Sequence, residues 1–173
     1  VKVKLVEGLW GSLPPDKLRT IEEIENTAAS LLSQMTLDEK IGQMSGDTPR
    51  FPGLIEMGWA YNTRPMPAGE NHRLGVPGVR FTDGPRGVSL PHSTCFPVTM
   101  ARGASWDVEL EERIGDAMGV EARSHGANLI GSTCINLLRH PAWGRAQETY
   151  GEDPFHLGEM GAAHVRGVQR HVM

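Results

Sequence analysis

Apolar residues recur at the three- and four-residue spacing of amphipathic helices in the first quarter of the chain. Two capping-box patterns, Thr20-x-x-Glu23 and Thr36-x-x-Glu39, mark where two such helices begin. The apolar positions expected to face inward are Ile21, Ile24, Ala28, Leu31, Leu32 and Met35 in the first helix, and Leu37, Ile41 and Met44 in the second. Both helices are interpreted as scaffold with a solvated, charged outer face.

Two further helices are predicted in the second half of the chain. One is capped by Asp107 and ends at Gly126, and the other begins at Asp153-Pro154, with proline at the first helical position. Their expected inward faces consist of Val108, Leu110, Ile114, Ala117, Met118 and Ala122 in the former, and Leu157, Met160, Gly161, His164 and Val168 in the latter. A short helical piece around Met100 is expected between the strands.

Two stretches have strand composition. The first, 76–82, is terminated by Asp83-Gly84-Pro85-Arg86-Gly87; the second, 128–137, is interrupted at Gly131-Ser132. Helices and strands therefore alternate, which indicates an α/β architecture with parallel strands. Residues 1–19 and 45–78 show no lasting period and are expected to be irregular, and a long segment of this kind usually serves function or is disordered.

Composition narrows the possible classes of function. The chain has 173 residues with 39% apolar content, enough for one domain with a core. A net charge of −4 argues against a nucleic-acid-binding surface, and no window of about eighteen apolar residues predicts a membrane span. Cys95 and Cys134 have neither the spacing of a metal site nor the density of a disulfide scaffold, so no metal site is predicted and the compartment stays open.

The candidate catalytic or binding residues lie mainly between Cys134 and Pro154, where apolar residues are followed by a loop rich in arginine, glycine and acids. This segment is called the arginine loop below. Arg139 and Arg145 carry planar guanidinium groups suited to an oxygen-rich ligand, and Trp143 offers a flat apolar face. The alternative is a lattice of Arg–Glu ion pairs, with Glu148 among the acids, that only pins a long loop.

Two further features have both a functional and a structural interpretation. Asp83 ends a strand and is able to accept hydrogen bonds from ligand hydroxyls, but Asp-Gly-Pro is also ordinary turn chemistry. His140 is placed in the arginine loop and is a weaker site candidate, whereas His164, on an apolar helix face, is expected to be a satisfied core histidine. No phosphate-binding loop, nucleophile elbow or zinc-binding helix motif occurs in the sequence.

Four segments together resemble the N-terminal domain of glycoside hydrolase family 3, the β-glucosidases and their relatives. In order, they are LLSQMTLDEKIGQM, RLGVPGVRFTDGPRGV, FPVTMARGASWD and NLLRHPAWGRAQETYGEDP. The resemblance implies that residues 1–173 are an incomplete N-terminal portion of a TIM-type (β/α)8 barrel, preceded by helices and a long irregular segment. A complete barrel of this type needs about 250 residues.

The resemblance also implies roles for particular residues. Asp83 and Arg145 correspond to positions that bind hydroxyls of the substrate's terminal sugar in the −1 subsite. Arg139, Glu148 and the Glu152–Asp153 pair correspond to positions expected to brace the loop. Many members carry a sugar-binding arginine six residues after the Asp of the DGP motif; this chain has Ser89 there, so we expect that contact to be lost or replaced by Arg86.

The family's Lys-His strand and its nucleophilic aspartate are expected beyond Met173, and the general acid/base further still. The implied function is therefore that of a fragment of a retaining β-glycosidase that hydrolyses terminal β-D-glucosides without a cofactor. The implied partners are a β-linked glucoside or oligosaccharide and the remainder of the barrel and C-terminal domains. The alternatives are a β-xylosidase or β-N-acetylglucosaminidase of the same family, or a non-catalytic sugar-binding fragment. The 173-residue chain alone is expected to be inactive, because a retaining glycosidase needs two carboxyl groups about 5–5.5 Å apart.

Overall fold

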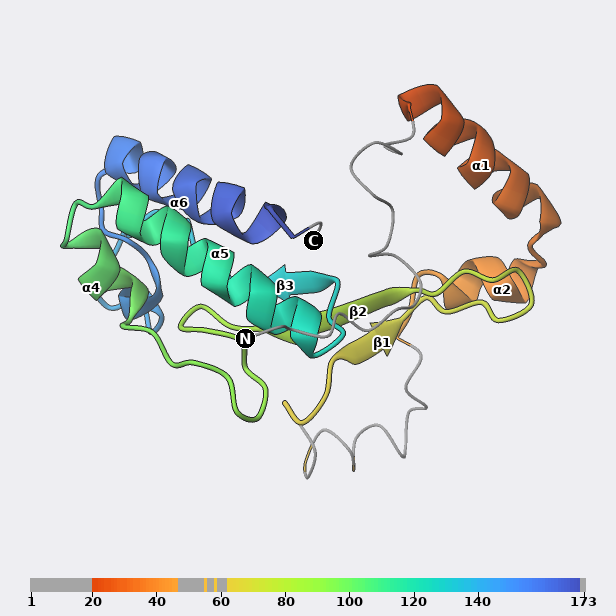
Figure 1. The fold of residues 1–173 in the computed structure, drawn as a ribbon, viewed down its shortest axis with the longest axis horizontal. Coiled ribbons are helices and arrows are strands. Elements are labelled where there is room, and N and C mark those ends of the chain that lie inside the picture. Colours follow the sequence, from red (N-terminus) through yellow and green to blue (C-terminus); the bar gives the residue numbers. More distant parts are fainter. Residues whose placement is uncertain (1–19, 47–54, 56–57, 59–61, 172–173) are drawn as a thin grey trace.

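A computed structural model describes residues 20–46, 55, 58 and 62–171 of the chain (Figure 1). Residues 1–19, with their expected irregular structure, and much of the irregular segment predicted for 45–78 lie outside the described residues. The helices are α1 (Ile21–Gln34), α2 (Leu37–Gly42), α4 (Thr99–Gly103), α5 (Val108–Ser124) and α6 (Pro154–Gln169), with a 3-10 turn η2 (Ala146–Glu148); the strands are β1 (Met66–Ala68), β2 (Val79–Asp83) and β3 (Leu129–Gly131).

The start signals of the two N-terminal helices are confirmed. The side chains of Thr20 and Thr36 each accept a hydrogen bond from the backbone N–H three residues on, and the carboxylates of Glu23 and Glu39 each accept one from the backbone N–H of the cap residue. The prediction of an inward apolar face was wrong for both helices, because neither contains a buried residue. In Figure 1, α1 stands apart from α4, α5 and α6, and most of its apolar positions are exposed, among them Ile21, Ile24 and Leu32.

The sheet is small and mixed, with strand order β1-β2-β3 in the described part of the chain. Strands β2 and β3 pair in parallel, as predicted, with Asp83 opposite Gly131. Strand β1 pairs with β2 in the antiparallel sense, which the prediction of parallel strands did not include. Strand β1 lies within the segment expected to be irregular, so it was not predicted from the sequence. The two predicted strands were too long, since β2 begins at Val79 and β3 ends at Gly131.

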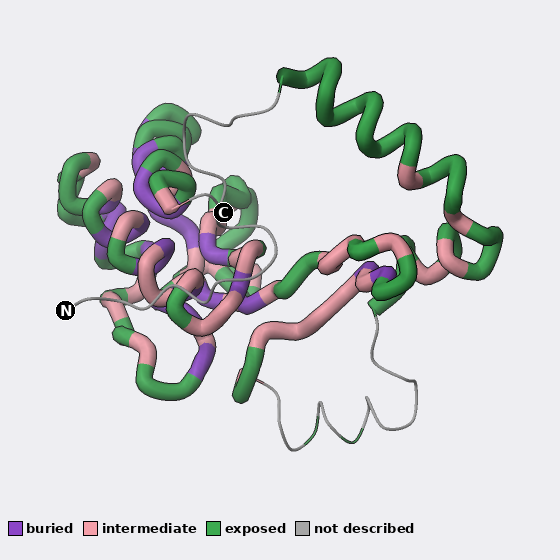
Figure 2. Tube along the Cα trace, turned by 45° about the vertical axis from the view of Figure 1, so that its right-hand side comes forward, coloured by how far each residue is buried: buried purple, intermediate pink, exposed green. Residues whose placement is uncertain are grey.

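Helices α5 and α6 pack side by side and cover the sheet's β3 end (Figure 1). Glycines allow this close approach: a Cβ at Gly115 or Gly167 would overlap the backbone of the opposite helix. The predicted inward face of α6 is confirmed at all five positions, whereas on α5 Leu110 and Ala117 are exposed. Figure 2 shows buried positions concentrated in this helical half of the molecule and none along α1. The α/β class is therefore confirmed, although the three described strands do not by themselves form a barrel.

Candidate functional site

Asp83 is the last residue of β2, and its side chain is half-buried. Its Oδ1 accepts a hydrogen bond from the N–H of Gly84 at 3.0 Å, which is the local turn contact expected of an Asp-Gly pair. Its Oδ2 has no partner among the described residues. The carboxylate therefore serves the turn with one oxygen and keeps the other available for a ligand.

The loop that follows Asp83 is tightly folded back on itself. The N–H of Ser89 donates to the carbonyl of Asp83 at 2.9 Å, and the N–H of Phe96 donates to the carbonyl of Arg86 at 2.6 Å. Gly84 has φ of 152°, and a Cβ there would overlap the carbonyl oxygen of Gly87. Close backbone contacts in this loop thus require the two glycines, Gly84 and Gly87, whatever Asp83 binds.

Arg145 and Glu148 form an ion pair at the start of η2. Arg145 donates from Nε at 3.0 Å and from Nη2 at 2.5 Å, both to Oε2 of Glu148. These hydrogen bonds lower the pKa of Glu148 and raise that of Arg145. The Arg145 side chain remains 66% exposed, so its other guanidinium N–H groups face outward. Glu148 therefore has the bracing contact expected of it, and its charge orients Arg145.

The structure brings the two predicted sugar-binding residues into one electrostatic cluster with Cys134. The negative charge of Asp83 contributes to the raised pKa of Arg145, and Arg86 contributes to the lowered pKa of Glu148. Burial, followed by the charge of Glu148, raises the pKa of the Cys134 thiol, while Arg145 lowers it. The two arginines and two acids thus come together from the loop after β2 and the loop that precedes α6.

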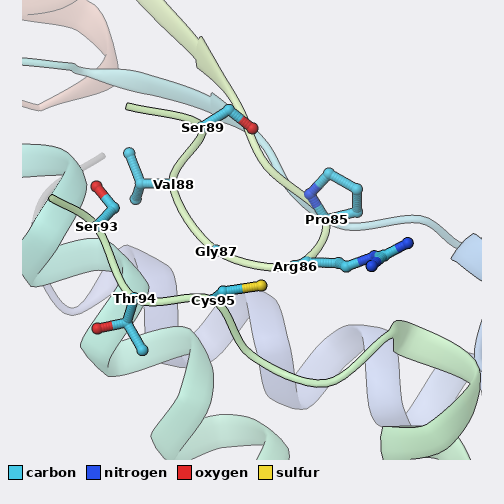
Figure 3. A pocket seen from close by; sticks show the side chains of 8 residues that line it. All are labelled: Pro85, Arg86, Gly87, Val88, Ser89, Ser93, Thr94 and Cys95. Atoms are coloured by element: carbon cyan, nitrogen blue, oxygen red, sulfur yellow. The ribbon is translucent and has the colours of Figure 1, made fainter. Parts of the chain in front are cut away.

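Arg86 lies on the rim of a pocket of ≈ 310 Å³ formed inside the loop after β2. Figure 3 shows its side chain directed away from Ser93 and Thr94, which line the opposite side of the pocket together with Cys95. Ser89, at the position where many relatives carry an arginine, is also part of the lining. Within the described part of the chain, the Arg86 side chain has no hydrogen-bond or ion-pair partner, so its guanidinium group is available to a ligand.

The remaining residues singled out in the arginine loop range from half-buried to exposed. Arg139 is exposed and has no ion pair with another described residue, so its bracing role stays a prediction. Trp143 is half-buried, and its backbone closes a turn by bonding to His140 and Ala146. His140 Nδ1 accepts a hydrogen bond from the backbone N–H of Ala142, so this ring nitrogen is occupied by a contact within the loop. Asp153 caps α6 as predicted, accepting from the N–H of His156 at 2.7 Å.

A buried polar cluster beneath the site was not predicted. Glu111 on α5, Arg102 on α4 and Tyr150 in the arginine loop join His164 on α6 in one hydrogen-bonded network. His164 is confirmed as a satisfied core histidine. Glu111 shares one stripe of α5 with Ile114, Gly115, Met118, Gly119 and Ala122, all buried. An acid within an apolar stripe was the signal that would have revealed the cluster.

Neither a metal site nor a membrane-spanning helix emerges from the described residues. No three His, Cys, Asp or Glu side chains among them are grouped closely enough to hold a metal ion. None of the described helices combines the length and apolar character that crossing a bilayer requires.

Asp83, at the carboxyl end of β2, and Arg145, in the loop that follows β3, form a guanidinium–carboxylate site. Such a site is typical of α/β proteins that bind polar ligands with the loops at their strand ends. The sequence profile described as "Glycosyl hydrolase family 3 N terminal domain" matches residues 60–173. The chain therefore belongs to glycosyl hydrolase family 3.

Individual relatives agree with this assignment. The chain is 34% identical over 153 residues to thermostable β-glucosidase B of Acetivibrio thermocellus, covering 80% of this chain and 18% of that protein. It is 31% identical over 159 residues to a β-xylosidase of Formosa agariphila, covering 88% of this chain and 19% of that protein. The structure of β-glucosidase 3B from Thermotoga neapolitana in complex with α-D-glucose is similar with a TM-score of 0.72 and 31% identity. That match covers 84% of this chain and 22% of the other.

The chain thus spans about a fifth of the length of the relatives it matches. The family is established on this shared region, as the resemblance implied.

Proposed function

We propose that residues 1–173 form the N-terminal part of the (β/α)8 barrel of a retaining β-glycosidase that hydrolyses terminal β-D-glucosides. The observation that carries this proposal is that the half-buried Asp83 carboxylate and the Arg145 guanidinium, which Glu148 orients and which is 66% exposed, lie close enough for their charges to interact. The β-glucosidases among the relatives support the choice of glucosides.

In this proposal Asp83 and Arg145 bind the non-reducing-end sugar from two sides. The free Oδ2 of Asp83 accepts a hydrogen bond from one sugar hydroxyl, and the outward N–H groups of Arg145 donate to oxygens of others. Bonds of this kind are charge-assisted and roughly twice as strong as neutral ones. They hold the ring in place while it distorts toward an oxocarbenium-like transition state.

Arg86 takes the place of the arginine that many family members carry at the position of Ser89. Its side chain is exposed and without a partner among the described residues, and it shares the pocket rim with Ser89. A long flexible arginine in place of one fixed six residues after Asp83 changes which sugar hydroxyl is bound. Sugar preference is therefore the property in which this protein is expected to differ from relatives that carry the arginine.

The nucleophile and the general acid/base are proposed to be supplied by chain beyond residue 173, along with the remaining strands and helices of the barrel. One carboxyl group attacks the anomeric carbon while the other protonates the leaving oxygen, and water later releases the sugar with retained configuration. No cofactor takes part in this chemistry.

The second candidate is a β-xylosidase, which is favoured by the match to the Formosa agariphila enzyme over 88% of the chain.

The complete reading frame that contains residues 1–173 is to be expressed and assayed with aryl β-D-glucosides, β-D-xylosides and N-acetyl-β-D-glucosaminides. We expect the highest kcat/KM on the glucoside, and a β-anomer as the first product seen by NMR. A preference for the xyloside or the glucosaminide selects the rival enzyme, and an α-anomer excludes the retaining mechanism. Sugar binding without any turnover supports a non-catalytic protein.

A further inference from the structure

Glu111 is the centre of the buried cluster beneath the two loops of the proposed sugar site. Its side chain is fully buried, and a single oxygen, Oε1, receives three hydrogen bonds. The donors are Arg102 Nη1 at 2.9 Å, the hydroxyl of Tyr150 at 2.7 Å and His164 Nδ1 at 2.8 Å. These donors come from α4, the arginine loop and α6, which are separate segments of the chain.

The directions of the hydrogen bonds follow from the charge of this carboxylate. An ionised carboxylate only accepts, so the imidazole of His164 carries its proton on Nδ1 and the Tyr150 hydroxyl is protonated. Burial and the charge of Glu111 also raise the pKa of Tyr150, which keeps its proton in place. The other ring nitrogen of His164, Nε2, is hydrogen-bonded to the hydroxyl oxygen of Ser132 at 2.9 Å. Three donors thus point toward one oxygen of Glu111, and Ser132 extends the network beyond His164.

One arm of the network reaches the loop of Asp83. Arg102 uses Nη2 to donate to the carbonyl of Pro85 at 2.7 Å, and Thr99 also donates to that carbonyl, at 3.4 Å. Pro85 follows Asp83 by two residues, within the loop closed by the bond from Ser89 to Asp83. The ion pair of Arg102 with Glu111 therefore fixes where this loop leaves β2.

A second arm reaches the loop of Arg145. Tyr150 lies five residues after Arg145, is buried, and bonds to Glu111 through its hydroxyl. The guanidinium of Arg102 lies over its ring at 5.7 Å from the centroid. A Cβ at Gly103 would overlap the carbonyl oxygen of Tyr150, so α4 and the arginine loop are in direct backbone contact.

The third arm reaches the end of β3. Ser132, which is hydrogen-bonded to His164, directly follows Gly131, and Gly131 is the register partner of Asp83. Three segments that define the geometry of the proposed site thus converge on one carboxylate oxygen.

We propose that Glu111 is a positioning residue that sets the spacing between Asp83 and Arg145, and hence the fit of the site to its sugar. This inference rests on the proposed function of those two residues. Stability alone is a poor explanation for the cluster, because a buried ion pair often contributes little net stabilisation compared with apolar residues. Glu111 Oε2 and Arg102 Nε also lack hydrogen-bond partners among the described residues, although both atoms are buried. What the arrangement achieves is a fixed geometry between the loop of Asp83 and the loop of Arg145.

The test uses Tyr150→Phe in the full-length enzyme, because it removes one hydroxyl and keeps the buried ring. Glu111→Gln is the second variant, and Glu112→Gln is the matched control. Glu112 is the next residue on α5, but its carboxylate pairs at the surface with Arg166 and Arg170. We expect Tyr150→Phe to lower kcat/KM roughly tenfold, which is the rate equivalent of one hydrogen bond to a charged group. The control is expected to leave kcat/KM unchanged.

A double-mutant cycle separates positioning from mere stabilisation. If Tyr150 acts through Arg145, then Tyr150→Phe loses its effect on kcat/KM in an Arg145→Ala background, where no guanidinium remains to be placed. A structural role instead predicts that the two losses multiply, and that kcat/KM falls only as far as the folded fraction falls. Multiplying losses, or equal effects of Glu111→Gln and Glu112→Gln, overturn the inference while leaving the proposed function intact. If Arg145→Ala alone has no effect, the proposed function falls, and the inference falls with it.

Discussion

Asp83 and Gly131 face each other in the parallel ladder of β2 and β3, and Asp83 Oδ1 lies 3.3 Å from where a Cβ on residue 131 would be. The Phe81 ring is equally close to that position, with Cε2 at 3.1 Å. Gly131 therefore leaves room for the Asp83 carboxylate at the end of its strand, and any side chain at 131 presses on it.

This relationship predicts the effect of Gly131→Ala in the full-length enzyme. The added methyl group displaces the Asp83 carboxylate or the Phe81 ring by a few tenths of an ångström. Since small misplacements of binding groups reduce rates strongly, we expect kcat/KM to fall by roughly tenfold. The control is Gly158→Ala on α6, where a Cβ meets nothing within 4 Å and the change should add about 0.5–1 kcal/mol of stability. A variant at 131 with a lower melting temperature but normal kcat/KM would show that Asp83 does not bind the substrate.

Local signals in the sequence predicted most of the helices. Both capping boxes, the Asp107 and Asp153 caps and the buried stripe of α6 follow from short-range physics, and all are confirmed. The strand-to-loop transition at Asp83 was also predicted correctly, because glycine and proline directly after an apolar run end a strand.

Features that depend on distant partners could not be predicted in the same way. The apolar stripe of α1 correctly predicted a helix, but the expectation that this face is buried was wrong. Periodicity indicates which face of a helix is apolar and does not indicate which other element covers it. Strand β1 consists of Met66-Pro67-Ala68, and only its pairing with β2 makes it a strand. The expectation that Asp83 and Arg145 belong to one site came from the family resemblance, because sequence spacing alone does not relate residues that are 62 positions apart.

Cysteine labelling offers a test of the site's electrostatics that needs no substrate. Cys95 is exposed, whereas burial and Glu148 raise the pKa of the Cys134 thiol. Because the thiolate is the reactive form, we expect Cys134 to react with a maleimide roughly tenfold or more slowly than Cys95, as followed by peptide mass spectrometry. Glu148→Gln should speed the labelling of Cys134, and Arg145→Ala should slow it. Equal changes in the same direction would mean that the two charges do not act on this thiol.

The 173-residue chain expressed alone is expected to self-associate and to show no turnover of aryl β-glucosides. Large apolar side chains on α1, on α2 and in the turn after α2 are strongly exposed, among them Ile21 and Met44 at 81% and Leu37 at 73%. Exposed apolar surface of this kind, together with unpaired strand edges, favours association. Size-exclusion chromatography with light scattering at several concentrations tests the first point. A monomer with one sharp melting transition would contradict it, and purified activity would contradict the second.

The Arg145–Glu148 pair predicts a pH dependence of the site. Arg145 lowers the pKa of Glu148 from its ordinary value of 4.5. A carboxyl group with a lowered folded-state pKa contributes fully above its unfolded value, and that contribution is lost as pH falls through the lowered value. Arg145 should thus remain oriented as the pH falls through 4.5 and lose its anchor only in stronger acid. Sugar affinity measured by product inhibition in wild type and Glu148→Gln tests this, since the acid-dependent part should be absent from the variant. An identical acid dependence in both proteins would exclude Glu148 as the anchor.

Substitution of Arg145 in the full-length enzyme decides between the two interpretations of the arginine loop. If the guanidinium binds sugar hydroxyls, its loss removes hydrogen bonds to a charged group that are worth about 1.5–3 kcal/mol. Arg145→Ala should then lower kcat/KM roughly ten- to a hundredfold, with little change in melting temperature, because the side chain is 66% exposed. Arg145→Lys should recover only part of the loss, since an ammonium group does not reproduce the planar, multi-donor geometry that bonds Glu148 through Nε and Nη2. If Arg145 only braces the loop, the order of effects is reversed: the melting temperature falls, and the molecules that stay folded turn over substrate at the normal rate. Measuring both quantities on the same preparation distinguishes the two, and a loss of stability without a loss of kcat/KM removes Arg145 from the proposed site.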